Sequence, residues 1–96
     1  MIHSTAIIET GAEIGSDVAV GPYSIIESGT KIGNGCVIGP HVSVMRHTTL
    51  GARCRIHAGA VLGDLPQDLG FGGGDSFVRL GSNCVVREGV TVHRGT

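Results

Sequence analysis

Branched aliphatic residues recur at every sixth position along almost the whole chain. The series consists of Ile2, Ile8, Ile14, Val20, Ile26, Ile32, Ile38, Val44, Leu50, Ile56 and Leu62, and it resumes in phase at Leu80, Val86 and Val92. An α-helix repeats its apolar face about every 3.6 residues and a half-buried strand every two, so a period of six fits neither. The pattern instead predicts many short strands, each followed by a turn.

The other positions of the hexad are also restricted. The fourth residue after the aliphatic is small, as at Ala6, Ala12, Val18, Ser24, Thr30, Cys36, Val42, Thr48, Cys54, Ala60, Cys84 and Val90. The residue just before this small one is often of a type that tolerates positive φ at a tight bend, as at Gly11, Gly29, Gly35, Gly59, Asn83 and Gly89. Three hexads with one large and one small inward residue each would close a triangular coil, and the coils would stack about 4.8 Å apart.

This pattern resembles the hexapeptide-repeat family of left-handed parallel β-helices. We therefore predict an all-β fold, a left-handed parallel β-helix spanning residues 1–96 with one external loop. Composition agrees, since 41% of the residues are hydrophobic, only 3% are aromatic and 17 are glycine. A narrow triangular interior accepts aliphatic side chains and has little room for rings. Cys36, Cys54 and Cys84 occupy the small inward position, so we interpret them as core residues rather than reactive thiols or a disulfide framework.

Charge and hydropathy exclude some classes of function. The formal net charge is -1, and the chain has no basic stripe of the kind that binds nucleic acid. No segment resembles an export signal or a membrane-inserting run, so a cytoplasmic protein without membrane insertion is expected.

The hexad series is interrupted once, between Asp64 and Phe77. The interrupting stretch contains Pro66, several glycines and its own apolar residues, and we interpret it as a loop excursion over about residues 64–78. Loops that project from a rigid scaffold commonly carry binding groups, although a tolerated surface insertion is the alternative. The sequence leaves open whether this stretch replaces two hexads or is inserted between them. Because the repeat stops within a coil, we expect the chain to be the N-terminal part of a longer domain.

Histidines are the remaining candidates for site chemistry. His41 and His47 fall at corners of neighbouring hexads, and with His57 they lack the closely spaced pair typical of a zinc site, so no metal is expected. His57 and His93 occupy the position after the aliphatic with outward side chains. We interpret His57 as an ordinary surface residue and His93 as a wall of any cleft beside the excursion.

A closer resemblance rests on several short segments in order. The opening hexads, Gln67-Asp68-Leu69, Arg87-Glu88 and Val90-Thr91-Val92-His93-Arg94-Gly95-Thr96 resemble the UDP-N-acetylglucosamine O-acyltransferases that begin lipid A synthesis. The resemblance implies a homotrimeric enzyme that transfers a hydroxyacyl chain from acyl carrier protein to the 3-hydroxyl of UDP-N-acetylglucosamine, without a cofactor. It also implies that Gln67 and Asp68 contact the nucleotide sugar and that His93 lines the site.

The chain departs from this family in two respects. Gly70 stands where the family often has a lysine, so one substrate contact is in doubt. The family's catalytic histidine lies in a coil beyond the His93-Arg-Gly-Thr stretch, so no catalytic base is assigned. Two other functions stay open: a sugar or serine O-acetyltransferase that uses acetyl-coenzyme A, and a non-catalytic β-helix scaffold.

Overall fold

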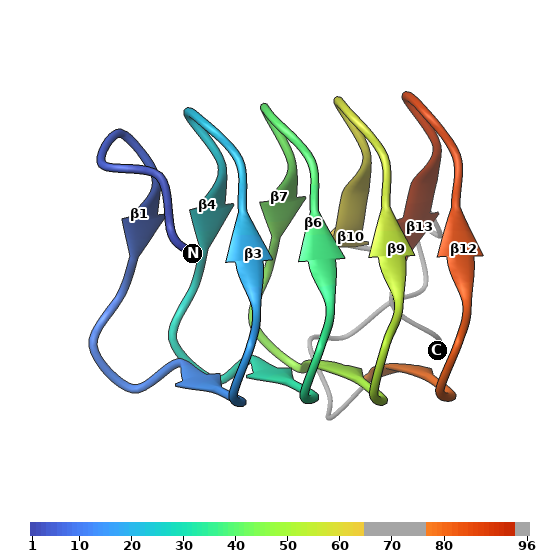
Figure 1. Ribbon diagram of the computed structural model, residues 1–96. Coiled ribbons are helices and arrows are strands. Elements are labelled where there is room, and N and C mark those ends of the chain that lie inside the picture. The colour runs from blue at the N-terminus through green and yellow to red at the C-terminus, as the bar shows by residue number, and fades with distance from the viewer. Residues whose placement is uncertain (65–76, 94–96) are drawn as a thin grey trace.

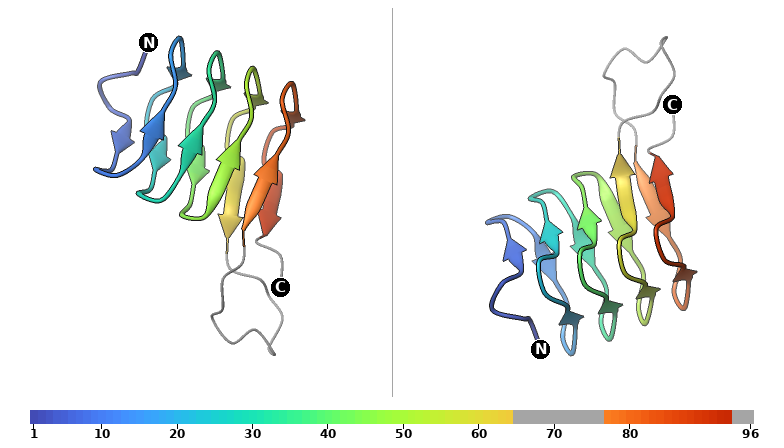
Figure 2. Two further views of the ribbon diagram at one scale, coloured as in Figure 1. Left: turned by 90° about the horizontal axis from the view of Figure 1, so that it is seen from below. Right: turned by 90° about the horizontal axis from the view of Figure 1, so that it is seen from above.

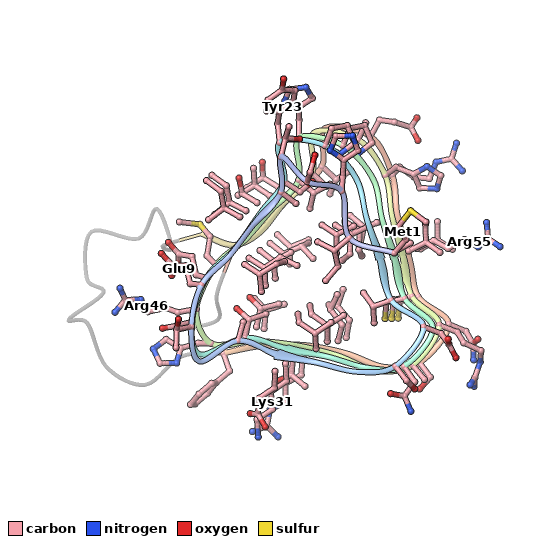
Figure 3. The ribbon with its side chains drawn as sticks, turned by 60° about the vertical axis from the view of Figure 1, so that its left-hand side comes forward. Met1, Glu9, Tyr23, Lys31, Arg46 and Arg55 are labelled. Atoms are coloured by element: carbon pink, nitrogen blue, oxygen red, sulfur yellow. The ribbon has the colours of Figure 1, made fainter. Side chains whose placement is uncertain are left out.

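The described part of the chain is a solenoid of short strands. The computed structural model describes residues 1–64 and 77–93, which form 13 strands and no helix. The strands build three parallel sheets, and these sheets are the three walls of a triangular prism (Figures 1 and 3). Among the described residues there is thus no helix that is long and apolar enough to cross a membrane.

Each wall takes every third strand of the chain. The β1 sheet contains β1 (Ile7–Ile8), β4 (Ile25–Ile26), β7 (Ser43–Val44), β10 (Val61–Asp64) and β13 (Thr91–His93). The β2 sheet contains β2 (Glu13–Ile14), β5 (Lys31–Ile32), β8 (Thr48–Leu50) and β11 (Val78–Leu80). The β3 sheet contains β3 (Ala19–Val20), β6 (Val37–Ile38), β9 (Arg55–Ile56) and β12 (Val85–Val86).

The solenoid coils with a left hand, which confirms the predicted fold. In Figure 1 the chain descends along the β1 sheet at the back, crosses below and rises along the β3 sheet in front, while it advances from left to right. Figure 2 shows the coils stacked in chain order, with the first and last strands at opposite ends. Crossovers between parallel strands are usually right-handed because strands twist. Most strands here have only two residues, so little twist accumulates along each wall.

The pairing register shows how the coils follow one another. In the first coils each residue pairs with the residue 18 positions later, as Ile7 does with Ile25. Across residues 65–76 the step is 30, because Val61 pairs with Thr91 and Arg55 with Val85. The segment thus adds twelve residues to one coil and does not make further rungs between the described strands. Since twelve is twice six, the hexad phase continues unchanged.

The interior consists of the two side-chain stacks that the sequence predicts. Ile26, Ile38, Leu50, Ile56 and Leu62 are all at most 2% exposed. The residues at the small position are equally enclosed, and Ser24, Thr30, Cys36, Val42, Thr48, Cys54 and Ala60 are each 0% exposed. Side chains near the ends of the stack are less covered, and Ile2 is 45% exposed because a described coil covers it on one side only.

Most corners contain one residue with positive φ, at the position that precedes the small residue. The glycines and Asn83 predicted for this role all have it, and so do five further residues: Asp17, Tyr23, His41, His47 and Arg53. A left-handed conformation costs a non-glycine residue roughly 1–2 kcal/mol. Hydrogen bonds to the preceding coil hold these corners, for example from the amide of His41 to the carbonyl of Pro22 at 3.0 Å.

The glycine that follows the aliphatic residue serves a different purpose, which is close packing between coils. A Cβ atom built on Gly33 would lie 2.8 Å from the amide nitrogen of Ala52, and one on Gly21 would lie 2.7 Å from the nitrogen of Pro40. These neighbours are backbone atoms that cannot move without breaking the ladder between coils.

The inward and outward residues of β6 provide a test of the core. Replacing Ile38 by Ala removes a side chain that is 2% exposed, so unfolding should require about 2–5 kcal/mol less free energy. Its neighbour Val37 points outward at 45% exposure and is the matched control, with a change of well under half that size expected. Urea denaturation followed by circular dichroism measures both, and equal losses would contradict the assignment of faces.

The close approach of the coils leads to a second prediction. In the 96-residue chain, Gly33→Ala should lower the melting temperature strongly, because the new methyl group meets the backbone of Gly51 and Ala52. Gly81 occupies the equivalent position, but a methyl group added there would have no described atom within 4 Å, so Gly81→Ala should be tolerated. Thermal melts of the two variants should therefore differ clearly.

Candidate functional site

Of the three predicted site residues, the structure places only His93. Gln67 and Asp68 lie outside the described residues, as does the stretch Pro66–Ser76 that was predicted to leave the wall. His93 is described at the level of its backbone, as the last residue of β13. It pairs in register with Asp64, the last residue of β10. The strand that carries His93 therefore lies directly beside the residue from which the chain continues to Gln67.

In the regular coils, the inward polar side chains form a recurring hydrogen bond. Inward polar side chains donate hydrogen bonds to a carbonyl fifteen residues later, in the next coil. The Ser24 hydroxyl donates to the carbonyl of Gly39 at 2.7 Å, and the Cys36 thiol donates to that of Gly51 at 3.1 Å. These bonds tie the small polar core residues to the next coil and satisfy their polar atoms inside an otherwise apolar interior.

Thr48, whose hydroxyl lies beside Gly63 in the next coil, does not follow this pattern. Its equivalent partner would be Gly63, but Gly63 has φ of 86° and the register shifts between Leu62 and Asp64. Among the described residues, the buried Thr48 hydroxyl has no hydrogen-bond partner. A Cβ on Gly63 would collide with that hydroxyl, so only glycine fits. Gly63 follows an aliphatic residue, as the packing glycines do, but it also lies at a β-bulge between Leu62 and Asp64.

The other end of the interrupting segment returns at the next wall. Phe77 is 48% exposed and precedes β11, whose Val78 amide donates to the carbonyl of His47 at 2.9 Å. The His47 ring meets the Phe77 ring edge to face at a centroid distance of 5.3 Å. The Arg79 guanidinium lies 5.6 Å from the centre of the same ring. The two strands that bracket the segment are thus anchored to neighbouring walls, with a cationic and aromatic cluster at the second.

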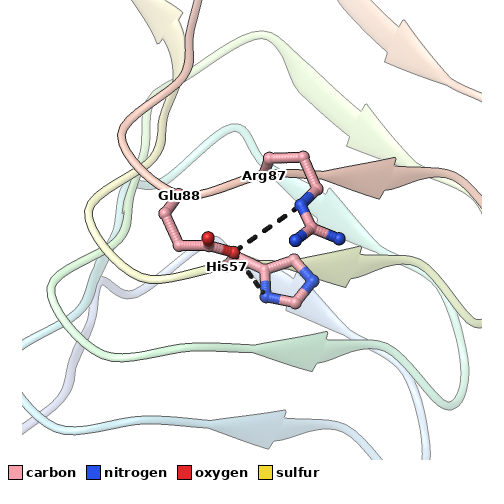
Figure 4. Close-up of polar contacts among 3 residues, drawn as sticks. All are labelled: His57, Arg87 and Glu88. Carbon is pink, nitrogen blue, oxygen red and sulfur yellow. Dashed lines mark ion pairs between the residues drawn. The ribbon is translucent and has the colours of Figure 1, made fainter.

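His57 belongs to a different corner, between the β3 and β1 sheets. Its Nδ1 lies 3.1 Å from Oε1 of Glu88 in the next coil, and Nε of Arg87 lies 3.7 Å from the same oxygen (Figure 4). His57 and Glu88 border a shallow hollow of about 300 Å³ that is also lined by Pro40 and Arg55. His57 is therefore at the surface as predicted, but with a carboxylate partner that the sequence did not reveal.

The remaining histidines do not converge. His41 stacks on Tyr23 with ring centroids 5.4 Å apart at the corner that also carries His57, whereas His47 is at the corner between the β1 and β2 sheets. The prediction that His41 and His47 point from different corners is confirmed. Within residues 1–64 and 77–93, no group of three His, Cys, Asp or Glu side chains is arranged to hold a metal ion.

The described cysteines are core residues, as predicted. All three are free, and Cys36 and Cys54 are fully buried. The Cys54 thiol donates to the carbonyl of Gly81 at 3.1 Å. Burial raises the pKa of Cys54, because the thiolate would lose its hydration in the apolar interior. None of these thiols is placed as a nucleophile.

Comparison with known proteins gives the site its context. The family described as bacterial transferase hexapeptide (six repeats) matches residues 29–64, and the hexapeptide repeat of succinyl-transferase matches residues 6–46. The acyl-[acyl-carrier-protein]–UDP-N-acetylglucosamine O-acyltransferase of Chlorobaculum parvum is 61% identical over 95 residues, which are 99% of this chain and 36% of that protein. The protein of the same name from Sulfurihydrogenibium is 62% identical over 95 residues, 99% of this chain and 35% of its own length.

Solved structures agree with these sequences. The UDP-N-acetylglucosamine O-acyltransferase of Moraxella catarrhalis has a TM-score of 0.94 at 37% identity and covers 99% of this chain. The related structure from Acinetobacter baumannii has a TM-score of 0.96 at 42% identity, and its match also covers 99% of this chain. The chain is thus similar to one part of each of these acyltransferases. It spans 37% of each of these two solved chains, about the same share as of the curated relatives.

For this acyltransferase-like chain, two contacts near the site were missed by sequence reasoning. His47 and Phe77 are 30 positions apart, as are Thr48 and Val78, which pair in register. The hexad phase contained a signal for these contacts, since the two members of each pair occupy the same position in the hexad. The hexad phase alone does not say which of several equivalent residues becomes the neighbour.

The buried thiol predicts a pH dependence of stability. A raised pKa in the folded state means that the unfolded chain, whose thiol titrates at about pH 8.5, releases its proton first. Stability is therefore complete below that pH and falls as the pH rises above it. Cys54→Ser keeps the hydrogen-bond donor but does not titrate, so its alkaline loss should be smaller. Urea midpoints at pH 7 and pH 10 test this, and identical losses in both proteins would contradict it.

Proposed function

We propose that this chain forms part of an acyltransferase that moves a hydroxyacyl group from acyl carrier protein to the 3-hydroxyl of UDP-N-acetylglucosamine, the first step of lipid A synthesis. The observation that carries the proposal is the identity of 61–62% over 95 residues to two proteins named for this reaction. The three-dimensional match at TM-scores of 0.94–0.96 to solved UDP-N-acetylglucosamine O-acyltransferases also supports it.

The corner geometry is compatible with such chemistry. Acyl transfer needs a base that takes the hydroxyl proton, donors for the thioester oxyanion and groups that hold the sugar. In our proposal Gln67 and Asp68 hold the sugar and His93 lines the same cleft. The register pairing of His93 with Asp64 supports a common location, since Gln67 follows Asp64 by three residues. No residue of this chain is proposed as the general base.

The proposed enzyme is a cytoplasmic homotrimer, with acyl carrier protein and UDP-N-acetylglucosamine as its partners. The acyltransferase names of the relatives support the two substrates. Exposed apolar residues on two walls, among them Ile7, Ile25, Val37 and Val85, are suited to contacts between subunits. An acetyl-coenzyme A-dependent transferase and a non-catalytic scaffold are less well supported, because the similar proteins carry the acyl carrier protein in their names.

A chimaera tests the proposed sugar site. Residues 1–96 would replace the matching part of the Chlorobaculum parvum relative, and kcat/KM would be measured with an acyl carrier protein thioester and UDP-N-acetylglucosamine. Asp68→Ala should lower kcat/KM for the nucleotide sugar roughly 10- to 150-fold, which corresponds to about 1.5–3 kcal/mol for a lost charged hydrogen bond. His93→Ala should also impair turnover.

Two matched variants act as controls. Glu13→Ala removes an exposed carboxylate from the β2 sheet, and His57→Ala removes the imidazole at the opposite corner; both should leave kcat/KM unchanged. Full activity of Asp68→Ala would refute the proposed contact between Asp68 and the sugar. If His57→Ala impaired turnover as much as His93→Ala, the site would have been placed at the wrong corner. An inactive parent chimaera would count against the acyltransferase proposal itself.

A further inference from the structure

Charge is separated along the axis of the solenoid. All seven Lys and Arg residues of the sequence follow Thr30, whereas four of its eight Asp and Glu residues precede it. Because the coils stack in chain order, distance along the sequence becomes distance along the axis (Figure 2). The first coils are therefore acidic, and the coils next to the interrupting segment carry the basic side chains. A partner with an acidic surface is attracted to the later coils.

Two of these cations lie near the corner between the β1 and β2 sheets. Arg46 extends from that corner, and Lys31 lies on the outer face of the β2 sheet (Figure 3). The residue ladder on this face runs from Glu13 through Lys31 and Thr49 to Arg79. The ladder thus begins with the acidic Glu13 and ends with the basic Arg79, which follows Phe77 by two residues.

The guanidinium groups of Arg46 and Arg79 form no ion pair with any described residue. The Glu27 carboxylate of the preceding coil accepts a hydrogen bond from the backbone amide of Arg46 at 2.9 Å. The Arg79 guanidinium lies over the face of the Phe77 ring. The ion pairs that the described residues do form involve Lys31, His57 and Arg87.

An exposed ring lies among these cations. Phe77 is 48% exposed, with His47 against its edge and Arg79 over its face. Aromatic and arginine side chains are the ones that most often dominate protein–protein binding, and charge complementarity around them sets specificity and association rate. A nucleotide sugar offers a diphosphate to the cations and a base to the ring, and the test below therefore measures the constants of both substrates. The combination fits a protein surface that is acidic and presents an apolar residue.

We propose that Arg46, Phe77 and Arg79 form a docking surface for the acyl-donor carrier protein. The inference rests on the proposed function, which makes acyl carrier protein the macromolecular partner of the enzyme. Phe77 follows the segment that carries Gln67 and Asp68, so a carrier protein docked here has its thioester close to the proposed sugar site. Arg46 and Arg79 pair with carboxylates of the carrier, and Phe77 packs against its apolar residue.

The chimaera described above provides the test. In Arg46→Glu/Arg79→Glu the KM for the acyl carrier protein thioester should rise about tenfold or more, because both attractive contacts become repulsive. The KM for UDP-N-acetylglucosamine and kcat at saturation should stay unchanged. Phe77→Ala should raise the same carrier-protein KM. Arg55→Glu, which reverses an exposed charge on the β3 sheet, is the matched control and should have no effect.

Ionic strength supplies a second readout. The carrier-protein KM of the parent should rise with salt, since ions screen exposed charges beyond about 10 Å at 0.1 M, and the double variant should have lost this dependence. A rise in the sugar KM with an unchanged carrier-protein KM would mean that the cations serve the nucleotide diphosphate, and it would overturn the proposal. Unchanged constants for both substrates would overturn it as well.

Direct binding separates this inference from the proposed function. Calorimetric titration of acyl carrier protein into the parent chimaera and the double variant needs no turnover. If acyl carrier protein binds to the parent and not to the double variant, the docking surface is supported. This holds even if the parent is inactive, because inactivity would refute only the proposed reaction. Equal binding to both proteins, or no binding to the parent, refutes the docking surface. Thermal melts establish that each variant is folded.

Discussion

The stacking of aliphatic side chains inside a narrow triangular prism is the constraint on which the rest of this structure depends. One aliphatic and one small side chain per hexad fill the interior, and Ile26 and Leu62 are completely buried in it. The coils also stack closely along the axis, which requires glycine where two backbones meet, as at Gly33. Its regular corners turn through one residue with positive φ, even at His41 and Arg53. Period, composition and turn chemistry are therefore consequences of one packing arrangement.

The candidate site arises where this arrangement is locally relaxed. At Gly63 the ladder bulges, and Thr48 loses the carbonyl partner that its position in the coil would otherwise provide. The walls on both sides stay in register, so β13 continues beside β10 and β11 beside β8. A rigid solenoid can in this way accept twelve additional residues without disturbing its core. Binding groups on such a segment are held by two strands whose positions are fixed by the ladder.

The charge of the outward side chains changes along the axis of an otherwise repetitive scaffold. The hexad restricts two inward positions and one corner, but it leaves the outward positions free to vary. Along the β2 sheet those positions change from Glu13 to Arg79 over four strands. The His57–Glu88 pair and the stacked Tyr23 and His41 rings likewise use outward positions in neighbouring coils. Variation of function within this architecture is thus confined to side chains that do not affect the core.

The sequence by itself determined the fold, because the residues that face inward and those that turn are fixed by a local period of six. It also identified the cysteines as core residues and the break after Asp64. Only the tertiary structure decided which hexads become neighbours beyond Leu62. A step of 18 and a step of 30 preserve the same phase, so the pattern alone cannot distinguish them. The contacts of His47 with Phe77 and of His57 with Glu88 depend on that choice, since both join residues in successive coils across the added segment.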